Sequence, residues 1–332
     1  MFYTNTTKHY ALKQLHQNPR QSYHNFLLLQ LKLHIMKLPK YYLAAVTAFI
    51  IWGFFSFVLK PLHNYPSPDI LFYRVFTCIV LMVIINLAFR RDKVTETRTY
   101  LKALTPKDRR NQWLLIAGSS VLLTANWGLF IYVMNQISVK AASFAYLVCP
   151  ILTTVFAFII LKEKLTKVQW FAVVISFASC AILSYNDLHD AMFSIIVAAT
   201  YALYLVMQKR ITMPDRFILL TLQIGITALI ILPFYPAYSG PVPHSPIFYS
   251  FILLIAVVFT IIPMFLNLFA MKGINSSTVG ILIYLNPLIA FALAIFFYKE
   301  AITFEQLLAY SLILVSIVVF NIGSYLKMKA VK

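Results

Sequence analysis

The stretches "LKEKLT" (residues 161–166) and "YKEAIT" (residues 298–303) share one pattern, Lys-Glu-x-x-Thr, at an offset of 137 residues. The same offset relates further identical residues on both sides of this pattern: Met134/Met271, Ile137/Ile274, Pro150/Pro287 and Gln169/Gln306. We therefore expect two copies of one unit, which cover residues 41–185 and 190–326.

The composition indicates a membrane protein. Hydrophobic residues make up 61% of the 332 residues and charged residues only 11%, whereas soluble domains carry about 25% charged residues. A helix that crosses a membrane needs about 20 mostly apolar residues, and this chain contains many such windows. We expect an all-α polytopic protein embedded in a lipid bilayer.

The apolar runs divide into ten expected transmembrane helices, five in each copy. Their expected ranges are 41–61, 70–89, 112–135, 139–161, 168–185, 190–208, 216–236, 247–271, 275–298 and 304–326. Basic residues favour the cytoplasmic side of a membrane. With the N-terminus inside, 24 Lys and Arg fall on that side, and only Lys140 and Lys299 fall on the other. We therefore expect both termini to be cytoplasmic.

The odd number of helices in each copy determines how the copies relate. Because each copy has five helices, the second copy enters the membrane upside down. Inverted repeats related by a pseudo-two-fold axis in the membrane plane are typical of secondary transporters. Two similar halves that face opposite ways can exchange conformations at small energetic cost, as alternating access requires. The sequence therefore predicts a carrier.

The two ends of the chain are basic. Residues 1–40 hold six basic residues, no acidic residue and four of the seven histidines, and residues 327–332 form a short basic tail. The segment "MKLPKYYLAAV", which begins at Met36, is a natural start for a membrane protein. We expect residues 1–35 to be dispensable or to precede the true start. The spacing of their histidines fits no metal-ligand pattern.

Other function classes find little support. The net charge is +18, and the basic residues lie between apolar runs, as in a membrane protein. We therefore expect no nucleic acid as a partner. Cys78, Cys149 and Cys180 lie inside apolar segments, where we expect reduced thiols. No Gly-x-Gly loop or His-Glu-x-x-His motif occurs, so we expect no cofactor, no metal and no enzymatic activity. A non-transporting membrane sensor or assembly protein stays an alternative, and a homodimer stays open.

Several motifs resemble a known family. They are "AFIIWGFFSFVLK" (48–60), "DILFYRVF" (69–76), "NWGLFIYVMN" (126–135), "AASFAYLVCPILTTVFAFIILKEKLTKVQW" (141–170) and the Glu-x-x-Thr-x-x-Gln ends of both copies. Together with the duplication, they resemble the EamA family of the drug/metabolite transporter superfamily, and more narrowly its RarD-type branch. The resemblance covers residues 37–326. It implies a transporter of the cytoplasmic (inner) membrane that exports a small metabolite or drug-like solute.

One position departs from the RarD-type pattern. RarD-type proteins often carry Asn-Pro in the fourth helix, where this chain has Cys149-Pro150. The second copy keeps Asn286-Pro287. If that asparagine contacts substrate in relatives, the first copy lacks the contact.

The two prolines lie near the middle of equivalent helices. Proline cannot donate to the carbonyl four residues back, so Pro150 and Pro287 free the carbonyls of Tyr146 and Ile283. Freed carbonyls at membrane depth must be buried in protein or line a cavity. Two interpretations stay open, a central substrate path or packing kinks.

Arg74 is a charge inside an expected span. It lies five residues past Asp69 and hence about 7 Å from the outer end of its helix. Such a charge faces a cavity or reaches the interface. Lys60 and Arg74 predict an outer basic vestibule that favours a carboxylate or another anion, with Asp69 as a structural partner. Alternatively, Lys60 caps its helix, as its counterpart Lys209 would.

Aromatic and amide side chains at mid-depth complete the candidate substrate site. They are Trp52, Asn126, Trp127, Tyr146, Tyr201, Tyr284 and Asn286. Asn126 needs a hydrogen-bond partner, supplied either by a neighbouring helix or by substrate. Because aromatic residues make up 16% of the chain, a lipid-facing or core position is the ordinary explanation for each ring.

The repeated motif at the end of each copy is expected to be structural. Its residues are Glu163, Thr166, Gln169, Glu300, Thr303 and Gln306. We expect the two glutamates to cap helices or form pairs at matching turns. No Asp or Glu lies mid-membrane in the expected topology, which disfavours a central carboxylate as a proton carrier.

Overall fold

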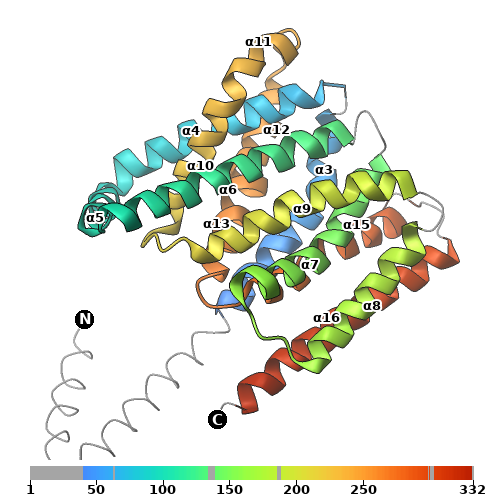
Figure 1. Ribbon diagram of the computed structural model, residues 1–332. Coiled ribbons are helices and arrows are strands. Elements are labelled where there is room, and N and C mark those ends of the chain that lie inside the picture. The colour runs from blue at the N-terminus through green and yellow to red at the C-terminus, as the bar shows by residue number, and fades with distance from the viewer. Residues whose placement is uncertain are drawn as a thin grey trace, which may run out of the picture.

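The structure is a computed structural model that describes residues 40–62, 64–133, 139–184, 188–297, 299 and 303–330. All regular secondary structure in these ranges is helical (Figure 1), which confirms the expected all-α class. The predictions about residues 1–35 fall outside the described residues.

Helical residues 40–53 come first. The elements that follow are α3 (Phe55–Leu59), η1 (Lys60–Leu62), α4 (Ser67–Phe89), α5 (Arg91–Ala103), α6 (Pro106–Tyr132), α7 (Val139–Leu161), α8 (Lys167–Ser184), α9 (Leu188–Arg210), α10 (Arg216–Ile231), η3 (Leu232–Phe234), α11 (Tyr235–Tyr238), α12 (Pro246–Ala256), η4 (Val257–Ile261), α13 (Ile262–Ala270), α14 (Ser276–Leu282), α15 (Leu285–Phe296) and α16 (Phe304–Ala330). Helices α4, α6 and α9 run in similar directions in Figure 1, whereas α10 crosses them steeply.

Each of the ten expected ranges coincides with a helical stretch, but not all qualify as spans. Seven helices in the described residues are long and apolar enough to cross a membrane by length and composition. Ala145–Leu161 and Lys167–Leu183 form shorter apolar helices. The protein is therefore a multi-pass membrane protein. Fewer than the ten expected helices in the described residues are long and apolar enough to count as spans.

Four expected helices are interrupted. The first breaks at Phe54, and the seventh ends in a 3₁₀ turn at Leu232–Phe234. The eighth contains a π-helix over Val257–Ile261, and the ninth breaks at residues 283–284. Proline lies in or just after three of these interruptions. Its missing backbone N–H removes a helical hydrogen bond, which favours a break there.

The connector expected over residues 90–111 contains a helix that the sequence reasoning missed. Its segment α5 (Arg91–Ala103) follows α4 after a single residue. The hydroxyls of Tyr100 and Thr212 lie 2.8 Å apart, so α5 is fixed to the loop that precedes α10.

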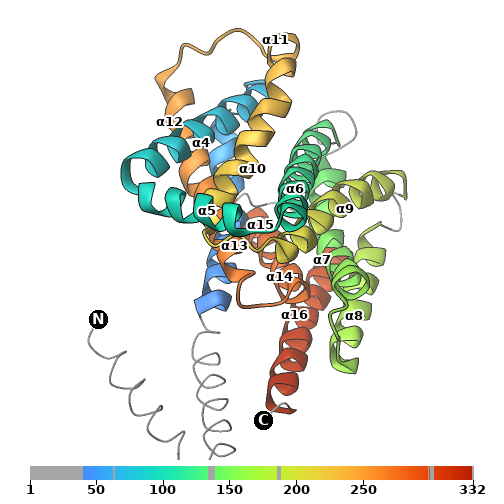
Figure 2. The same cartoon turned by 60° about the vertical axis from the view of Figure 1, so that its left-hand side comes forward.

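The last helices of the two copies lie side by side and antiparallel, as Figures 1 and 2 show for α8 and α16. Ser176 Oγ donates to Ser316 Oγ at 2.9 Å. Three residues later on α8, Ser179 Oγ donates to the carbonyl of Ala309 at 2.8 Å. Because residue numbers rise on one helix as they fall on the other, the equivalent helices point in opposite directions.

Equivalent helices of the two copies also make equivalent contacts with the other copy. Helix α6 of the first copy packs against α10, and its second-copy equivalent, the α12–α13 helix, packs through α12 against α4. Helices α7 and α14, the equivalents that carry or precede the prolines, pack against each other. The copies therefore interdigitate about a pseudo-two-fold axis.

The repeated motif adopts the same local structure twice. Lys162 has φ 56° and Lys299 has φ 58°, a left-handed conformation that is common where helices end but is usually occupied by glycine. Thr166 and Gln169 then exchange side-chain-to-backbone hydrogen bonds at the start of α8. Thr303 and Gln306 do the same at the start of α16. Each motif is thus a helix stop followed by a capping box.

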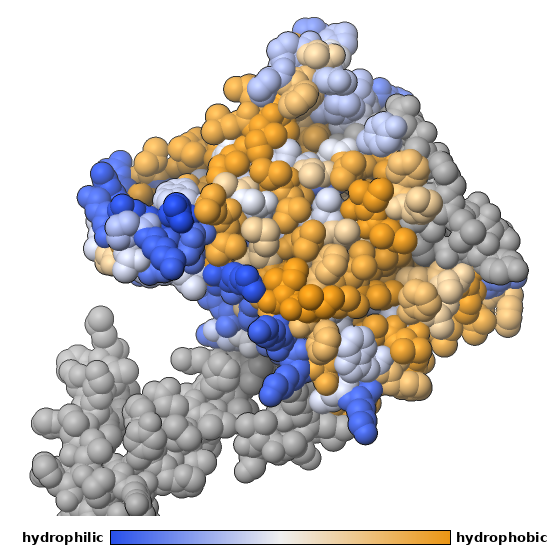
Figure 3. All heavy atoms as spheres, in the orientation of Figure 1, coloured by the Kyte–Doolittle hydropathy of each residue, from blue (hydrophilic) through white to orange (hydrophobic). Residues whose placement is uncertain are grey.

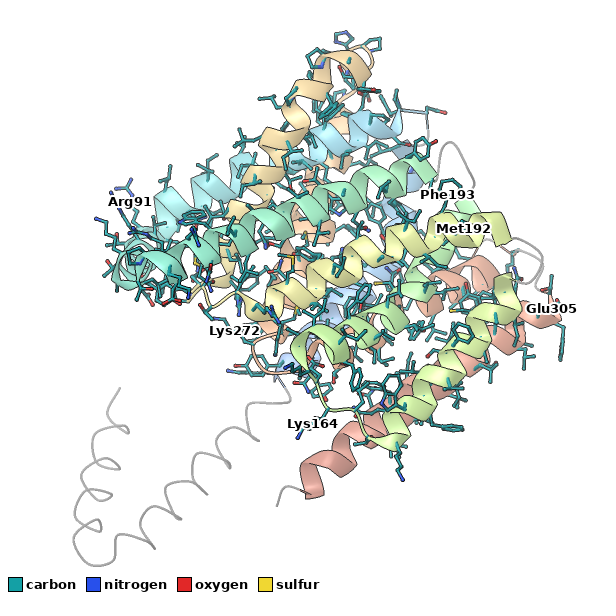
Figure 4. All side chains as sticks on the ribbon, viewed as in Figure 1. Arg91, Lys164, Met192, Phe193, Lys272 and Glu305 are labelled. Carbon is teal, nitrogen blue, oxygen red and sulfur yellow. The ribbon has the colours of Figure 1, made fainter. Side chains whose placement is uncertain are left out.

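The surface separates by polarity. Figure 3 shows hydrophilic residues gathered over α5 and along the adjoining edge, beside a broad hydrophobic face. In Figure 4, Arg91, Lys164 and Lys272 mark this basic end, whereas Phe193 and Glu305 mark the opposite end of the bundle. The bundle therefore has one basic end, as a positive-inside topology requires.

Candidate functional site

Arg74 and Trp127 form the centre of the candidate site. Arg74 is the eighth residue of α4, about 10 Å along the helix from Ser67. Its guanidinium lies 4.4 Å from the centre of the Trp127 ring on α6, which is within cation–π distance. Within the described residues, Arg74 Nε is buried without a hydrogen-bond partner, and neither of the two ion pairs includes Arg74.

Tyr146 of α7 lies beside Arg74. The two side chains are close enough to interact electrostatically, and both are half-buried. Tyr146 on α7 packs against Phe130 on α6, with ring centres 5.4 Å apart. Helices α4, α6 and α7 therefore bring Arg74, Trp127 and Tyr146 close to one another.

Trp52 reaches across to the second copy. Its Nε1 donates to the carbonyl of Phe259 at 2.8 Å, inside the π-helix of residues 257–261. Pro263 cannot supply the backbone N–H that would bond this carbonyl in an α-helix. Trp52 therefore satisfies a carbonyl that a proline has freed. The sequence analysis did not name Phe259 or Pro263. The position of Pro263 four residues after Phe259 could have predicted that the Phe259 carbonyl lacks its helical partner.

The two predicted prolines have different effects. Pro150 lies within the unbroken α7, whereas Pro287 follows the break at residues 283–284. The carbonyl of Ile283 was expected to be free. Instead it accepts the backbone N–H of Asn286 at 3.0 Å, because the break allows a tighter turn there.

The amide candidates have separate positions. Asn126 Nδ2 donates to the carbonyl of Val197 at 2.9 Å and to the hydroxyl of Thr200 at 3.2 Å. Asn126 is buried, so its amide links α6 to α9, the interhelical alternative. Asn286 is half-buried near the start of α15.

Two tyrosine candidates lie in the core. Tyr284 is fully buried, and its hydroxyl lies near Ser176 of α8. Tyr201 stacks on Tyr204, with ring centres 5.7 Å apart.

Asp69, which we expected in an outer vestibule as a partner of Arg74, has a different partner. Its carboxylate accepts the backbone N–H of Gly240 at 3.0 Å and 3.2 Å, so Asp69 fixes the loop after α11 instead of pairing with Arg74. Asp69 is only 1% exposed, and a buried carboxylate needs such donors. Lys60 lies in η1, and its side chain is outside the described residues.

At the basic end, Glu163 joins the two copies. It follows α7, and its carboxylate accepts the backbone N–H groups of Ser276 and Ser277 at 2.9 Å and 3.2 Å. The hydroxyl of Ser277 also donates to it, at 2.6 Å. Glu163 therefore caps α14, where the first backbone N–H groups lack helical partners. Glu300 lies outside the described residues.

Basic side chains reinforce the same end. Lys209 Nζ donates to the carbonyls of Met271 and Ile274, both at 2.6 Å, and so holds the loop that leads into α14. Arg210 donates to the carbonyl of Ile160 in the other copy at 2.7 Å. Lys209 thus binds carbonyls at the end of α13 and in the loop before α14. The sequence analysis had suggested that it caps its own helix.

The family comparison matches the chain twice. The model of the EamA-like transporter family matches residues 39–185 and 190–322. These ranges agree closely with the two copies read from the repeated motif.

Similar proteins and one solved structure agree with this match. The chain is 24% identical over 281 residues to protein RarD of Escherichia coli K12, which covers 84% of this chain and 92% of that protein. It is 28% identical to an uncharacterized transporter, YojE, of Bacillus subtilis, over 82% of this chain and 91% of that protein. A solved crystal structure described only as that of a protein has the same fold, with TM-score 0.66, 13% identity and coverage of 84% and 96%.

Proposed function

This chain belongs to the EamA-like transporter family, and we propose that it carries a small anionic solute across the cytoplasmic membrane by alternating access. The observation that carries the proposal is Arg74. The Arg74 Nε is buried and has no hydrogen-bond partner in the described residues, which is costly, and a substrate carboxylate or phosphate would supply both the charge and the hydrogen bonds.

The aromatic neighbours narrow the solute further. Trp127 occupies one face of the Arg74 guanidinium, which leaves the edge of that group to bind an anion. Tyr146 lies near the Arg74 guanidinium and carries a hydroxyl. A small molecule that combines an anionic group with an apolar body suits this mixture of one cation and several rings.

The inverted halves supply the mechanism. We assign residues 41–185 to one half and 190–326 to the other, with both termini in the cytoplasm and outward transport as the net direction. We infer that the cap of Glu163 on α14 holds the cytoplasmic end closed in one of the two conformations. Glu300 is related to Glu163 by the repeat offset, so we propose that Glu300 provides the equivalent cap when the outer end closes.

Counterflow in proteoliposomes tests the proposal. The wild-type protein should accumulate a labelled small carboxylate when the same unlabelled compound is trapped inside. Arg74→Ala should abolish this uptake at equal protein incorporation, because Arg74 is the cation that contacts Trp127 in the described residues. Arg110→Ala, which removes an exposed arginine from α6, should keep the wild-type rate.

Two outcomes would contradict the proposal. Normal carboxylate uptake by Arg74→Ala would show that Arg74 does not bind the solute. If only neutral or cationic solutes show counterflow in a wide screen, the protein is a carrier but its solute is not an anion.

A further inference from the structure

A groove at the basic end lies apart from the candidate substrate site. It has a volume of about 330 Å³ and lies between α5, α6 and α10. Its floor is apolar and includes Val94 and Leu101 of α5 and Ile218 and Leu222 of α10. In each pair, the spacing of seven or four residues places both side chains on one face of a helix.

Three cations lie around this apolar floor. Arg98 and Lys102 come from α5 and Arg109 from α6, and all three are exposed. None of them takes part in the ion pairs of the described residues. Three like charges around one groove repel one another, so the groove is complementary to an anion.

Thr97 adds a polar group beneath the cations. It lines the groove and is only 4% exposed, and its hydroxyl has no hydrogen-bond partner in the described residues. Buried hydroxyls normally have a partner. A ligand in the groove would supply an acceptor for this hydroxyl.

The groove lies at the level of lipid headgroups. Helix α4 qualifies as a membrane span up to Phe89, and that residue is 81% exposed. The charged α5 begins two residues later, so it lies at the membrane surface. Trp113 lines the groove and is 41% exposed, and exposed tryptophans are enriched at this depth.

We propose that this groove binds an anionic phospholipid. Arg98, Lys102 and Arg109 bind the phosphate, and the hydroxyl of Thr97 donates to a phosphate or ester oxygen. One acyl chain covers Leu101 and the apolar floor. Basic pockets between membrane helices on the cytoplasmic side are suited to acidic headgroups. This proposal does not depend on the identity of the transported solute.

Native mass spectrometry of the full chain in a mild detergent tests the proposal. Phosphatidylglycerol and phosphatidylcholine with identical acyl chains are added at equal concentrations, and the lipid adducts are counted. The wild-type protein should retain phosphatidylglycerol in preference. The triple variant Arg98→Gln, Lys102→Gln, Arg109→Gln should lose at least about tenfold in phosphatidylglycerol adducts, because each basic residue near the headgroup contributes to binding.

The matched control changes the same charge elsewhere. Lys107→Gln, Arg110→Gln, Lys167→Gln removes three exposed basic residues of the described chain that do not line the groove. It should keep the wild-type adducts. Equal loss in both triple variants would reduce the effect to net charge and overturn the site, as would no loss in the groove variant.

A second variant and a competitor separate the lipid from simpler explanations. Leu222→Trp fills the apolar floor without changing charge, and it should also reduce phosphatidylglycerol adducts. Undiminished adducts in Leu222→Trp would contradict the placement of the acyl chain. Inorganic phosphate at millimolar concentration should not displace the lipid. Displacement by phosphate alone would show that the groove is a site for free anions.

Discussion

Ser277 of the second copy donates its hydroxyl to the carboxylate of Glu163 in the first copy, at 2.6 Å. Two backbone N–H groups at the start of α14 bind the same carboxylate. Three donors on one ionised group make this the most strongly hydrogen-bonded contact described between the copies at the basic end. Movement of the copies against each other must break it.

We expect Glu163→Gln to open the basic end of the bundle more often, if the cap of Glu163 on α14 holds that end closed as proposed. Hydrogen bonds to charged groups are each worth about 1.5–3 kcal/mol, so a neutral amide should raise the open population about tenfold. A cysteine at buried Thr278, introduced as Thr278→Cys, should then react about tenfold faster with a maleimide applied from the basic end. Glu96→Gln, an exposed acid at the same end, is the control and should leave that rate unchanged. Equal rates in both variants would contradict the role of Glu163.

We expect Lys162 and Lys299 to lie on opposite sides of the membrane. Lys162→Cys should resist a membrane-impermeant maleimide applied outside intact cells, whereas Lys299→Cys should react. The native Cys78, Cys149 and Cys180 are all buried, so their background should be low. Labelling of both positions from one side would overturn the inverted arrangement in the membrane.

We expect substitution of Trp127 to weaken transport in proportion to the loss of its ring. A cation–π contact in a desolvated site is worth up to about 2 kcal/mol, so Trp127→Leu should lower transport efficiency about 5- to 30-fold. Trp127→Phe keeps an aromatic face and should lose less. Initial counterflow rates over a range of solute concentrations would measure both variants. Trp170→Leu removes an exposed tryptophan of α8 and should be neutral, and a Trp127→Leu variant as active as this control would refute the expectation.

We expect Gly280→Ala to destabilise the crossing of α7 and α14. A Cβ atom at residue 280 would lie 2.9 Å from Cβ and Cγ2 of Thr153, and such overpacking costs about 1–3 kcal/mol. Gly128→Ala is a matched control, because a Cβ there meets nothing within 4 Å. Thermal unfolding in detergent should show a lower midpoint for Gly280→Ala only. Similar midpoints would mean that the crossing adjusts without cost.

Pattern and composition were sufficient for the class and the repeat. Apolar length sets which segments can cross a membrane, and the shared motif at residues 161–166 and 298–303 revealed the duplication. The family match over 39–185 and 190–322 and the antiparallel contact of Ser176 with Ser316 agree with that reading. These features are local or periodic, so a single sequence contains them.

Partners distant in sequence were not readable. Asp69 binds Gly240, Glu163 caps α14, and Trp52 satisfies the Phe259 carbonyl. The sequence indicated that each of these polar side chains needs a hydrogen-bond partner. It did not indicate which of several helices supplies that partner. Similarly, α5 is polar by composition, and only its packing beside α6 and α10 showed that it forms one wall of a groove.

The sequence by itself determined that this chain is a duplicated, helical membrane protein, because hydrophobic length and repetition are properties of the chain alone. Only the tertiary structure decided that Arg74 stacks on Trp127 without an acid partner in the described residues, and that Glu163 caps α14. Hydrogen bonds and ion pairs depend on distances of a few ångströms between segments that are far apart in the sequence. Those distances are fixed only when the helices pack.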